Sequence, residues 1–287
     1  MATPRCNRLW RGAWGDWFPH KKQKKQKKQI MTIIDRLREM VPDDAQICDV
    51  VVGIFWTYVR TQYGVAVSAT AHRWVEDPPG AIIPWAGELI GKRVRDVADL
   101  YASESLTARS LANAAISASF PASAMTGCEI QGRGQDLLHT FCNKSNDLCH
   151  IALIGHFHFA DELARLGHVL DIYELDPRCT QGEIPSSQIP QRLPQADIVV
   201  MTSSTIITHS TEDILAAARP DAIKMIVGPT VPLHPILWDY GFDAICASLI
   251  DDPEQVRFAA AQGGNHKQMV GARKVNFVNP LKAHLFV

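Results

Sequence analysis

The chain has 287 residues, of which 46% are hydrophobic and 21% charged, a composition typical of globular proteins. A usual domain has ~100–200 residues, so this length predicts two domains, and no stretch approaches the ~20 consecutive apolar residues of a membrane-spanning helix. Seven cysteines occur without CxxC spacing and without a signal peptide ahead of them, which indicates reduced thiols rather than a disulfide framework. We therefore expect a cytoplasmic protein that does not insert into a membrane.

The net charge of −1 hides an asymmetry between the first 30 residues and the rest. Residues 1–30 carry nine Lys/Arg and one acidic residue, which leaves 20 Lys/Arg and 29 acidic residues in 31–287. The lysine run at residues 21–28 could attract nucleic acid or anionic lipid, but such charge blocks are typical of solvated tails. We expect residues 1–30 to be a basic, disordered extension, and nucleic acid is not an expected partner.

The folded part is predicted to begin near Met31 with a helix. Thr32 supplies an N-cap hydroxyl and Asp35 an acidic residue three positions later, at the start of a run of apolar residues at helical spacing. Residues 47–71 then contain two β-rich segments with Gly64 at the expected turn, which predicts a strand pair.

Helical patterns follow the predicted strands. One lies within residues 94–101, and the next, at residues 106–120, is apolar nearly all round and is therefore predicted to be a buried helix. Strands followed by helices are typical of an α+β domain. We predict that residues 31–145 form this smaller domain.

Residues 146–287 show a different pattern, in which apolar strands alternate with helices. Continuous apolar runs joined by helical crossovers are typical of a parallel sheet. The sequence therefore predicts an α/β protein whose second domain is Rossmann-like, with a Pro-rich loop in place of the second helix. The predicted strands are 151–155, 169–174, 198–201, 223–227 and 244–249, and the predicted helices are 160–166, 211–218 and 235–240.

The loops at the carboxyl ends of the predicted strands are where a parallel sheet binds ligands. The first loop, residues 155–158, reads Gly-His-Phe-His and lacks the GxGxxG spacing of a standard NAD site. Glu174 follows the second strand, where a ribose hydroxyl is often held, although a solvated loop carboxylate is an equally good interpretation. Residues 202–205 offer four hydroxyl groups that could bind an anion or could form a turn and cap a helix.

The loop at residues 228–235 is stiff, because it contains one glycine and three prolines. Stiff loops suit binding sites, and neutral imidazoles are common ligands of late first-row metals. None of the candidate ligands has a diagnostic spacing such as HExxH, and a single loop histidine is more often a surface residue. The candidates in or near these loops are His156, His158, His209 and His234, with Glu174 and Cys179 able to complete a set.

Other catalytic signatures do not occur in the sequence. Cys142 and Cys149, which lie near the predicted domain junction, are interpreted as structural residues. No GxSxG follows a predicted strand, and no GxxxxGK[ST] loop is present, so a serine hydrolase or a P-loop kinase is not expected.

The order of several segments resembles a known family. These segments are VVVGIFWTYV, GVAVSATA, residues 112–118, IALIGHF, DIYELDP, ADIVVMTSSTI and IVGPTVPLHPILWDYGFDAICAS. Over residues 34–278 they are similar to the DUF364 family with its DUF4213 amino-terminal domain, whose members are described as heavy-metal chelation proteins. The resemblance implies an enolase-N-terminal-like α+β domain, then a Rossmann-like domain, with a ligand site in the cleft between them.

The resemblance also implies site residues, carried over motif by motif. His158 departs from the proline expected after the GHF motif, and Ser117 departs from an asparagine expected in the buried helix. The extra imidazole would strengthen metal binding, and the lost amide would remove a donor and an acceptor. The implied metal ligands are His156, His158 and Glu174, and the implied ligand-binding residues are Gly155, Phe157, Thr202, Ser204, Gly228, Pro229 and Thr230.

Two functions remain open at this point. The first is binding or chelation of a heavy metal or metal complex, with a transition or heavy metal ion as the cofactor class and a metal ion or small anionic ligand as the partner. The alternative is an enzyme that acts on a small anionic metabolite or nucleotide in the same crevice. Assembly into a homo-oligomer is left open by the sequence.

Overall fold

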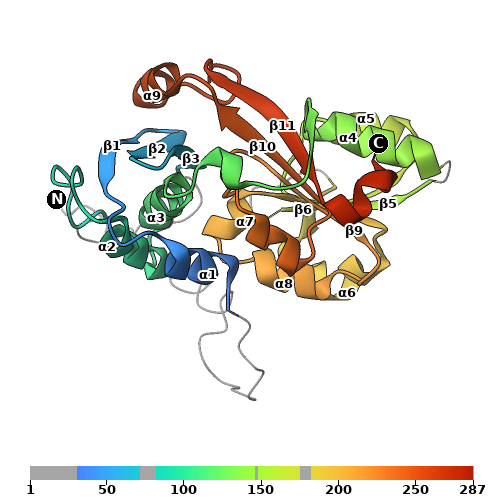
Figure 1. Ribbon diagram of the computed structural model, residues 1–287. Helices are drawn as coiled ribbons and strands as arrows, with labels where there is room; N and C mark the ends of the chain where they lie inside the picture. The colour runs from blue at the N-terminus through green and yellow to red at the C-terminus, as the bar shows by residue number, and fades with distance from the viewer. Residues whose placement is uncertain (1–30, 72–81, 146–147, 175–181, 287) are drawn as a thin grey trace, which may run out of the picture. The chain divides into compact units, whose positions relative to one another are not determined.

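The computed structural model of the protein describes residues 31–71, 82–145, 148–174 and 182–286 (Figure 1). The predicted basic extension 1–30 and the candidate ligand Cys179 lie outside the described residues. The described strands form two sheets, a three-stranded sheet in the order β1-β2-β3 and an eight-stranded sheet in the order β4-β11-β10-β9-β8-β5-β6-β7. No described helix is long and apolar enough to cross a membrane. The protein is thus a mixed α/β structure, as the sequence predicts.

The smaller sheet is antiparallel and comprises β1 (Ile47–Val52), β2 (Trp56–Thr61) and β3 (Val65–Ala69). The hairpin predicted at Gly64 is confirmed, because β2 and β3 pair on either side of it. The sequence predicts a strand pair here, whereas the structure has a third strand. The additional turn forms at Gly53, whose N–H donates to the Trp56 carbonyl at 3.0 Å, and a Cβ on Gly53 would lie 2.1 Å from the Ala260 carbonyl oxygen.

Helices from distant parts of the chain cover both faces of the smaller sheet (Figure 1). The α3 helix (Leu106–Ala118) packs on one face, and α9 (Pro253–Ala261) packs on the other. The α1 helix (Ile33–Met40) begins as predicted, since Thr32 Oγ1 accepts a hydrogen bond from the Asp35 N–H at 3.1 Å. The predicted helix at 94–101 is a short α2 (Val94–Ala98) continued by the 3-10 helix η1 (Asp99–Ala102).

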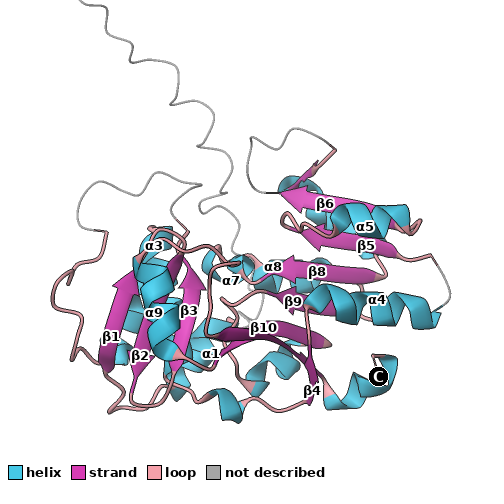
Figure 2. Ribbon diagram, turned by 90° about the horizontal axis from the view of Figure 1, so that it is seen from above, coloured by secondary structure: helices cyan, strands magenta, loops and turns pink. Residues whose placement is uncertain are grey.

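Six neighbouring strands of the larger sheet are parallel, in the order β7-β6-β5-β8-β9-β10 (Figure 2). The strand β11 pairs antiparallel with β10, and β4 pairs antiparallel with β11 at the edge of the sheet. The sequence predicts neither strand. The bounds are β4 (Cys128–Gln131), β5 (His150–Ile154), β6 (Val169–Glu174), β7 (Ile184–Pro185), β8 (Ile198–Thr202), β9 (Ile223–Val227), β10 (Ala244–Ile250) and β11 (Ala272–Val278).

Both faces of the parallel strands are buried, which explains their continuous apolar sequences. Alternate residues of β5, Ile151 and Leu153, face α4 (Gly134–Ser145) and α5 (Ala160–Arg165). Ala152 and Ile154 belong to the core on the opposite face, with residues of α7 and α8. The remaining helices are α6 (Ile189–Arg192), α7 (Ser204–Ile207) and α8 (Thr211–Ala217), and the remaining 3-10 helices are η2 (Ala122–Ala124), η3 (Ser186–Gln188), η4 (Leu193–Gln195), η5 (Pro235–Tyr240) and η6 (Pro280–Leu285).

Two predicted elements of the second half need correction. The segment predicted as a Pro-rich loop contains β7 and α6. Pro190 lies in the first turn of α6, where a backbone N–H would make no hydrogen bond within the helix, so proline is tolerated there. The predicted helix at 235–240 is the 3-10 helix η5, which starts with a proline and ends at Gly241 in the left-handed region with φ +85°.

Candidate functional site

The predicted strand-end loops contact one another at the point where the strand order reverses. Gly155 follows β5 with φ +101°, and a Cβ on it would lie 2.9 Å from Thr202 Cγ2 at the end of β8. Gly228 follows β9 with φ +138°, and a Cβ on it would lie 2.2 Å from Ser203 Oγ. Only glycine accommodates both the backbone angle and this close approach. The structure therefore brings the loops after β5, β8 and β9 together.

Several backbone N–H groups of these loops donate within the protein. The Gly155 N–H donates to the Tyr173 carbonyl at 2.8 Å, and the Gly228 N–H donates to the Cys246 carbonyl at 2.8 Å. Thr202 Oγ1 accepts from the Ser204 N–H at 3.4 Å at the start of α7. The two glycines thus do not offer their N–H groups to a phosphate as a glycine-rich nucleotide loop does. Ligand binding by the predicted set, which also includes Phe157 and Pro229, stays a prediction.

Thr230 connects the β9 loop to the smaller sheet and to α3. It is 1% exposed, its Oγ1 accepts from the Ala69 N–H at 2.9 Å, and its carbonyl accepts from Asn113 Nδ2 at 2.9 Å. Asn113 Oδ1 is buried without a hydrogen-bond partner among the described residues. The sequence did not predict Asn113 as a site residue, although an amide in an otherwise apolar helix was the available signal.

We expect Thr230→Val to destabilise the protein by about 1–3 kcal/mol, because it removes the acceptor of the Ala69 N–H and leaves that donor unsatisfied. Denaturation in urea measures the change in the free energy of unfolding. Thr140→Val is the matched control, since Thr140 is exposed and donates only within its own helix, to the Asp136 carbonyl. An equal cost in the two variants would contradict a structural role for the Thr230 hydroxyl.

The metal ligands implied by the resemblance do not gather in one group. His156 Nδ1 lies 3.1 Å from Glu183 Oε1, and its side chain is 69% exposed. His158 is exposed with its ring against Phe159, and Glu174 is the last residue of β6 and half-buried. The group of potential metal ligands that lies close together in the described residues is a different one. A metal role for His156, His158 and Glu174 stays a prediction.

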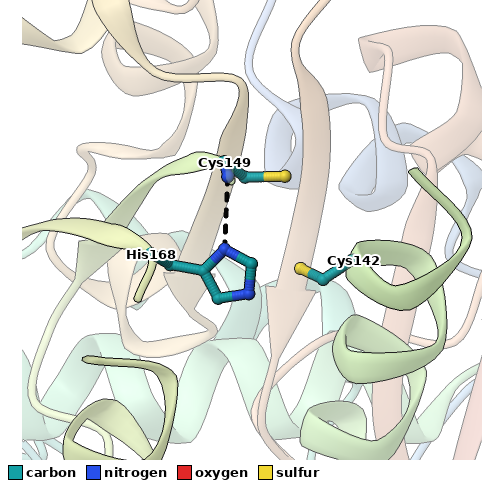
Figure 3. Close-up of side chains that lie close together, drawn as sticks. All are labelled: Cys142, Cys149 and His168. Carbon is teal, nitrogen blue, oxygen red and sulfur yellow. Dashed lines mark hydrogen bonds between the residues drawn. The ribbon is translucent and has the colours of Figure 1, made fainter. Parts of the chain in front are cut away.

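That group consists of Cys142, Cys149 and His168, which we term the thiol–imidazole cluster (Figure 3). One ligand atom from each residue lies within 4.8 Å of the others. Cys142 is in the last part of α4, Cys149 immediately precedes β5, and His168 immediately precedes β6. Because β5 and β6 are parallel neighbours, their amino ends meet at one edge of the sheet, opposite the strand-end loops.

Burial controls the chemistry of the two cysteines. Cys142 is 5% exposed and Cys149 is 6% exposed. Burial raises the pKa of the Cys142 thiol to about 12, with the neighbouring Cys149 as a further cause. A buried thiolate therefore needs a compensating positive charge, and a coordinated metal ion supplies one and displaces the proton outright.

His168 is oriented by a backbone hydrogen bond. Its Nδ1 accepts a hydrogen bond from the Cys149 N–H at 3.2 Å. Figure 3 shows that Cys142 Sγ lies beside the imidazole ring. In the neutral ring, Nε2 then carries the proton. Coordination by His168 requires this hydrogen bond to give way, and each sulfur must lose its proton to bind an ion.

The sequence interpretation of Cys142 and Cys149 as structural residues did not include His168. Six residues separate the cysteines, so no metal-binding spacing is visible. The three side chains come from three elements that only the tertiary structure places together. The structure is thus a mixed α/β protein with the strand-end loops at one edge of its larger sheet and the thiol–imidazole cluster at the other.

Two family models match the chain. The DUF364 model matches residues 140–279 and the DUF4213 model matches residues 34–120, and both carry the description "Putative heavy-metal chelation". The chain belongs to the DUF364 family, with DUF4213 as its amino-terminal part. The resemblance stated from the sequence is thereby confirmed. No curated protein matches the chain.

Solved structures of the same family share the fold. A DUF364 protein of unknown function from Desulfitobacterium hafniense is 20% identical, with a TM-score of 0.70 over 86% of this chain and 97% of that one. Another, from Pyrococcus horikoshii, is 16% identical, with a TM-score of 0.68 over 86% of this chain and 100% of that one. At these identities the likeness concerns the fold alone.

Proposed function

We propose that this protein binds a heavy-metal ion through Cys142, Cys149 and His168. The observation that carries the proposal is the meeting of two buried sulfurs and an imidazole within 4.8 Å of one another. The family description of heavy-metal chelation supports it independently. The metal is the cargo or ligand of the protein.

The donor set favours soft ions. Thiolate ligands select copper(I), zinc and the heavier ions of similar softness, whereas magnesium, calcium and manganese prefer carboxylate and carbonyl oxygens. Three protein donors are one fewer than a closed structural zinc site has, so a fourth position stays open to a small ligand. An ion held in this way can be passed to another thiol, which is the chemistry that chelation and delivery need.

The cytoplasmic location predicted from the sequence fits this chemistry. A reducing compartment keeps cysteines as thiols, whereas an oxidising one favours disulfides. Nearby cysteines retained as thiols are required for the cluster to bind an ion.

We further infer that residues 146–287 form a Rossmann-like domain and residues 31–145 an enolase-N-terminal-like domain, with a ligand site in the cleft between them. The parallel strand order β7-β6-β5-β8-β9-β10 supports the first part, since six Rossmann strands numbered along the chain have the order 3-2-1-4-5-6. The contacts of Thr230 with Ala69 and Asn113 show that the loop after β9 adjoins the smaller sheet and α3, which is where such a site would lie. If the ion were bound there instead of at the thiol–imidazole cluster, its ligands would be His156, His158 and Glu174.

The number of metal ions bound per chain, measured in the wild type and in variants, distinguishes binding at the thiol–imidazole cluster from binding at the strand-end loops. The full chain, purified without a histidine tag and under reducing conditions, is stripped with a chelator and reconstituted with cadmium(II). We expect near one ion per chain in the wild type, retention of the ion in His156→Ala/His158→Ala, and its loss in Cys142→Ser/Cys149→Ser. A thiolate-to-cadmium absorption band in the ultraviolet checks that sulfur binds the ion.

The matched control is Cys48→Ser/Cys128→Ser, which removes two thiols outside the cluster and should keep the ion. Loss of cadmium only from the histidine variant would overturn the cluster and place the metal at the strand-end loops. Circular dichroism and a thermal melt show whether each variant is folded.

A further inference from the structure

The structure contains a small cavity beside the strand-end loops, at the opposite edge of the sheet from the thiol–imidazole cluster. Its volume is about 20 Å³, and its lining includes Trp56, Pro229, Ser248, His266, Met269 and Lys274. A cavity needs roughly 10–15 Å³ to hold one water molecule. The cavity therefore has room for about one oxygen atom of a ligand whose remainder lies outside it.

The position of the cavity follows from the unequal lengths of the strands. β9 pairs only with Ala244–Cys246 of β10, whereas β11 pairs with β10 along its full length, including Ser248 opposite Lys274. The β10–β11 ribbon thus extends past the end of β9. Its side chains Ser248 and Lys274 line the cavity together with Pro229 of the β9 loop.

Among the described residues, Lys274 has no carboxylate partner. Its Nζ has one hydrogen-bond partner there, Ser248 Oγ at 3.5 Å. Although the residue as a whole is exposed, the protein around the ammonium group lowers its pKa by desolvation. A partly desolvated cation is costly unless a negative charge compensates it.

Further basic side chains gather at the same place. The pKa of His266 is lowered first by burial and then by the positive charges of Lys274, Lys267 and His158. The two lysines named here are cationic, although residues 31–287 carry nine more acidic than basic residues. A basic group in an acidic protein, beside a cavity, indicates an anionic ligand.

Donors of this kind suit a phosphoryl group. Lysine binds phosphate as a point charge, and hydroxyl and imidazole N–H groups donate to the remaining oxygens. Lys274 at the cavity, with Lys267 near His266, supplies positive charge opposite the charge of about −1.5 to −2 that a phosphate monoester carries at pH 7. Trp56 also lines the cavity, and its buried indole N–H has no acceptor among the described residues.

We propose that this cavity binds the phosphoryl group of a small ligand, with Lys274 as the main counter-charge and Ser248 and His266 as hydrogen-bonding partners. The site lies on the other edge of the sheet from the thiol–imidazole cluster and does not depend on the metal proposal. It gives the protein a second ligand, of the phosphate class.

Binding of inorganic phosphate and of adenosine monophosphate to metal-depleted full chain, followed by calorimetry at constant ionic strength with chloride, tests the proposal. We expect saturable phosphate binding in the wild type and an affinity at least tenfold lower in Lys274→Met. Lys92→Met is the charge-matched control, because Lys92 packs on Trp85, away from this cavity, and should bind as the wild type does.

His266→Gln provides a second variant on an exposed loop residue, with an expected partial loss of affinity. Cys142→Ser/Cys149→Ser should bind phosphate normally, which separates this site from the metal site. Tighter binding of the nucleotide than of phosphate would identify an organic phosphate as the ligand, and equal affinity would identify the free ion. Heat no larger than that of chloride, or undiminished binding in Lys274→Met, would overturn the proposal.

Discussion

Gly228→Ala is expected to destabilise the protein by about 3 kcal/mol or more, the combined cost of backbone strain and overpacking. The backbone at Gly228 has φ +138°, and the new Cβ would lie 2.2 Å from Ser203 Oγ and 3.3 Å from Ser203 Cβ. The backbone of Ser203, and with it Cβ, is held because the Ser203 N–H donates to the Val227 carbonyl at 2.9 Å. Rotation of Oγ would leave the close approach to Cβ in place. Denaturation in urea measures the loss as a lower transition midpoint.

Gly91→Ala separates backbone strain from the steric clash. Gly91 has φ +84°, and an added Cβ would have no described atom within 4 Å, so the expected cost is about 1–2 kcal/mol. Ser203→Ala introduced together with Gly228→Ala removes the nearest atom and should recover part of the difference. Equal costs at Gly91 and Gly228 would mean that the loops after β8 and β9 do not approach each other this closely.

Much of the larger sheet is predictable from the sequence, for a physical reason. The strands β5, β8 and β9 are buried on both faces and therefore read as continuous apolar runs. The antiparallel strands gave no such signal. β11 begins with exposed Arg273 and Lys274, and β4 has four residues of alternating burial, so neither differs from a loop in the sequence.

The helices α4 and α9 were also not predicted from the sequence. In α9 only Val256 and Ala260 are buried, because the helix covers one face of a sheet from another part of the chain. Such a helix leaves a narrow apolar stripe, which is a weak sequence signal. The buried helix α3 was predicted because eleven of its thirteen residues are buried.

Of the candidate sites, too, one could be predicted from the sequence and the others could not. The strand-end loops could be predicted, since a parallel sheet gathers the carboxyl ends of its strands at one edge. The thiol–imidazole cluster could not, because Cys142, Cys149 and His168 meet through the packing of α4 against the amino ends of β5 and β6. Lys274 was not predicted for the same reason as β11, whose antiparallel pairing brings it beside Ser248.

A third buried cysteine, Cys246, belongs to the same hydrophobic core as Cys142 and Cys149 but not to the thiol–imidazole cluster. Cys246 is 4% exposed on β10, and burial raises the pKa of its thiol to about 12. It is buried like Cys142, but it does not belong to a group of three potential ligands in the described residues. Burial alone thus gives an inert thiol, and the proximity of a second sulfur and an imidazole is what makes the cluster a candidate metal site.

Metal binding to the cluster should therefore stabilise the native protein strongly. A ligand present at a thousandfold excess over its dissociation constant adds about 4 kcal/mol if it binds only the folded state. For a chain of this length we expect cadmium(II) to raise the melting temperature by roughly 10 °C. Calorimetry or circular dichroism under reducing conditions measures the shift, and a chelator should reverse it.

The cluster variant gives the decisive comparison for this stabilisation. Cys142→Ser/Cys149→Ser should melt at the same temperature with and without cadmium, while Cys48→Ser/Cys128→Ser should respond as the wild type does. Binding of the ion to cysteines of the unfolded chain would reduce the shift similarly in the two double variants, which have the same number of cysteines, because the unfolded state would then also be stabilised. A full shift in the Cys142→Ser/Cys149→Ser variant would place the stabilising ion elsewhere and refute the thiol–imidazole cluster as the metal site.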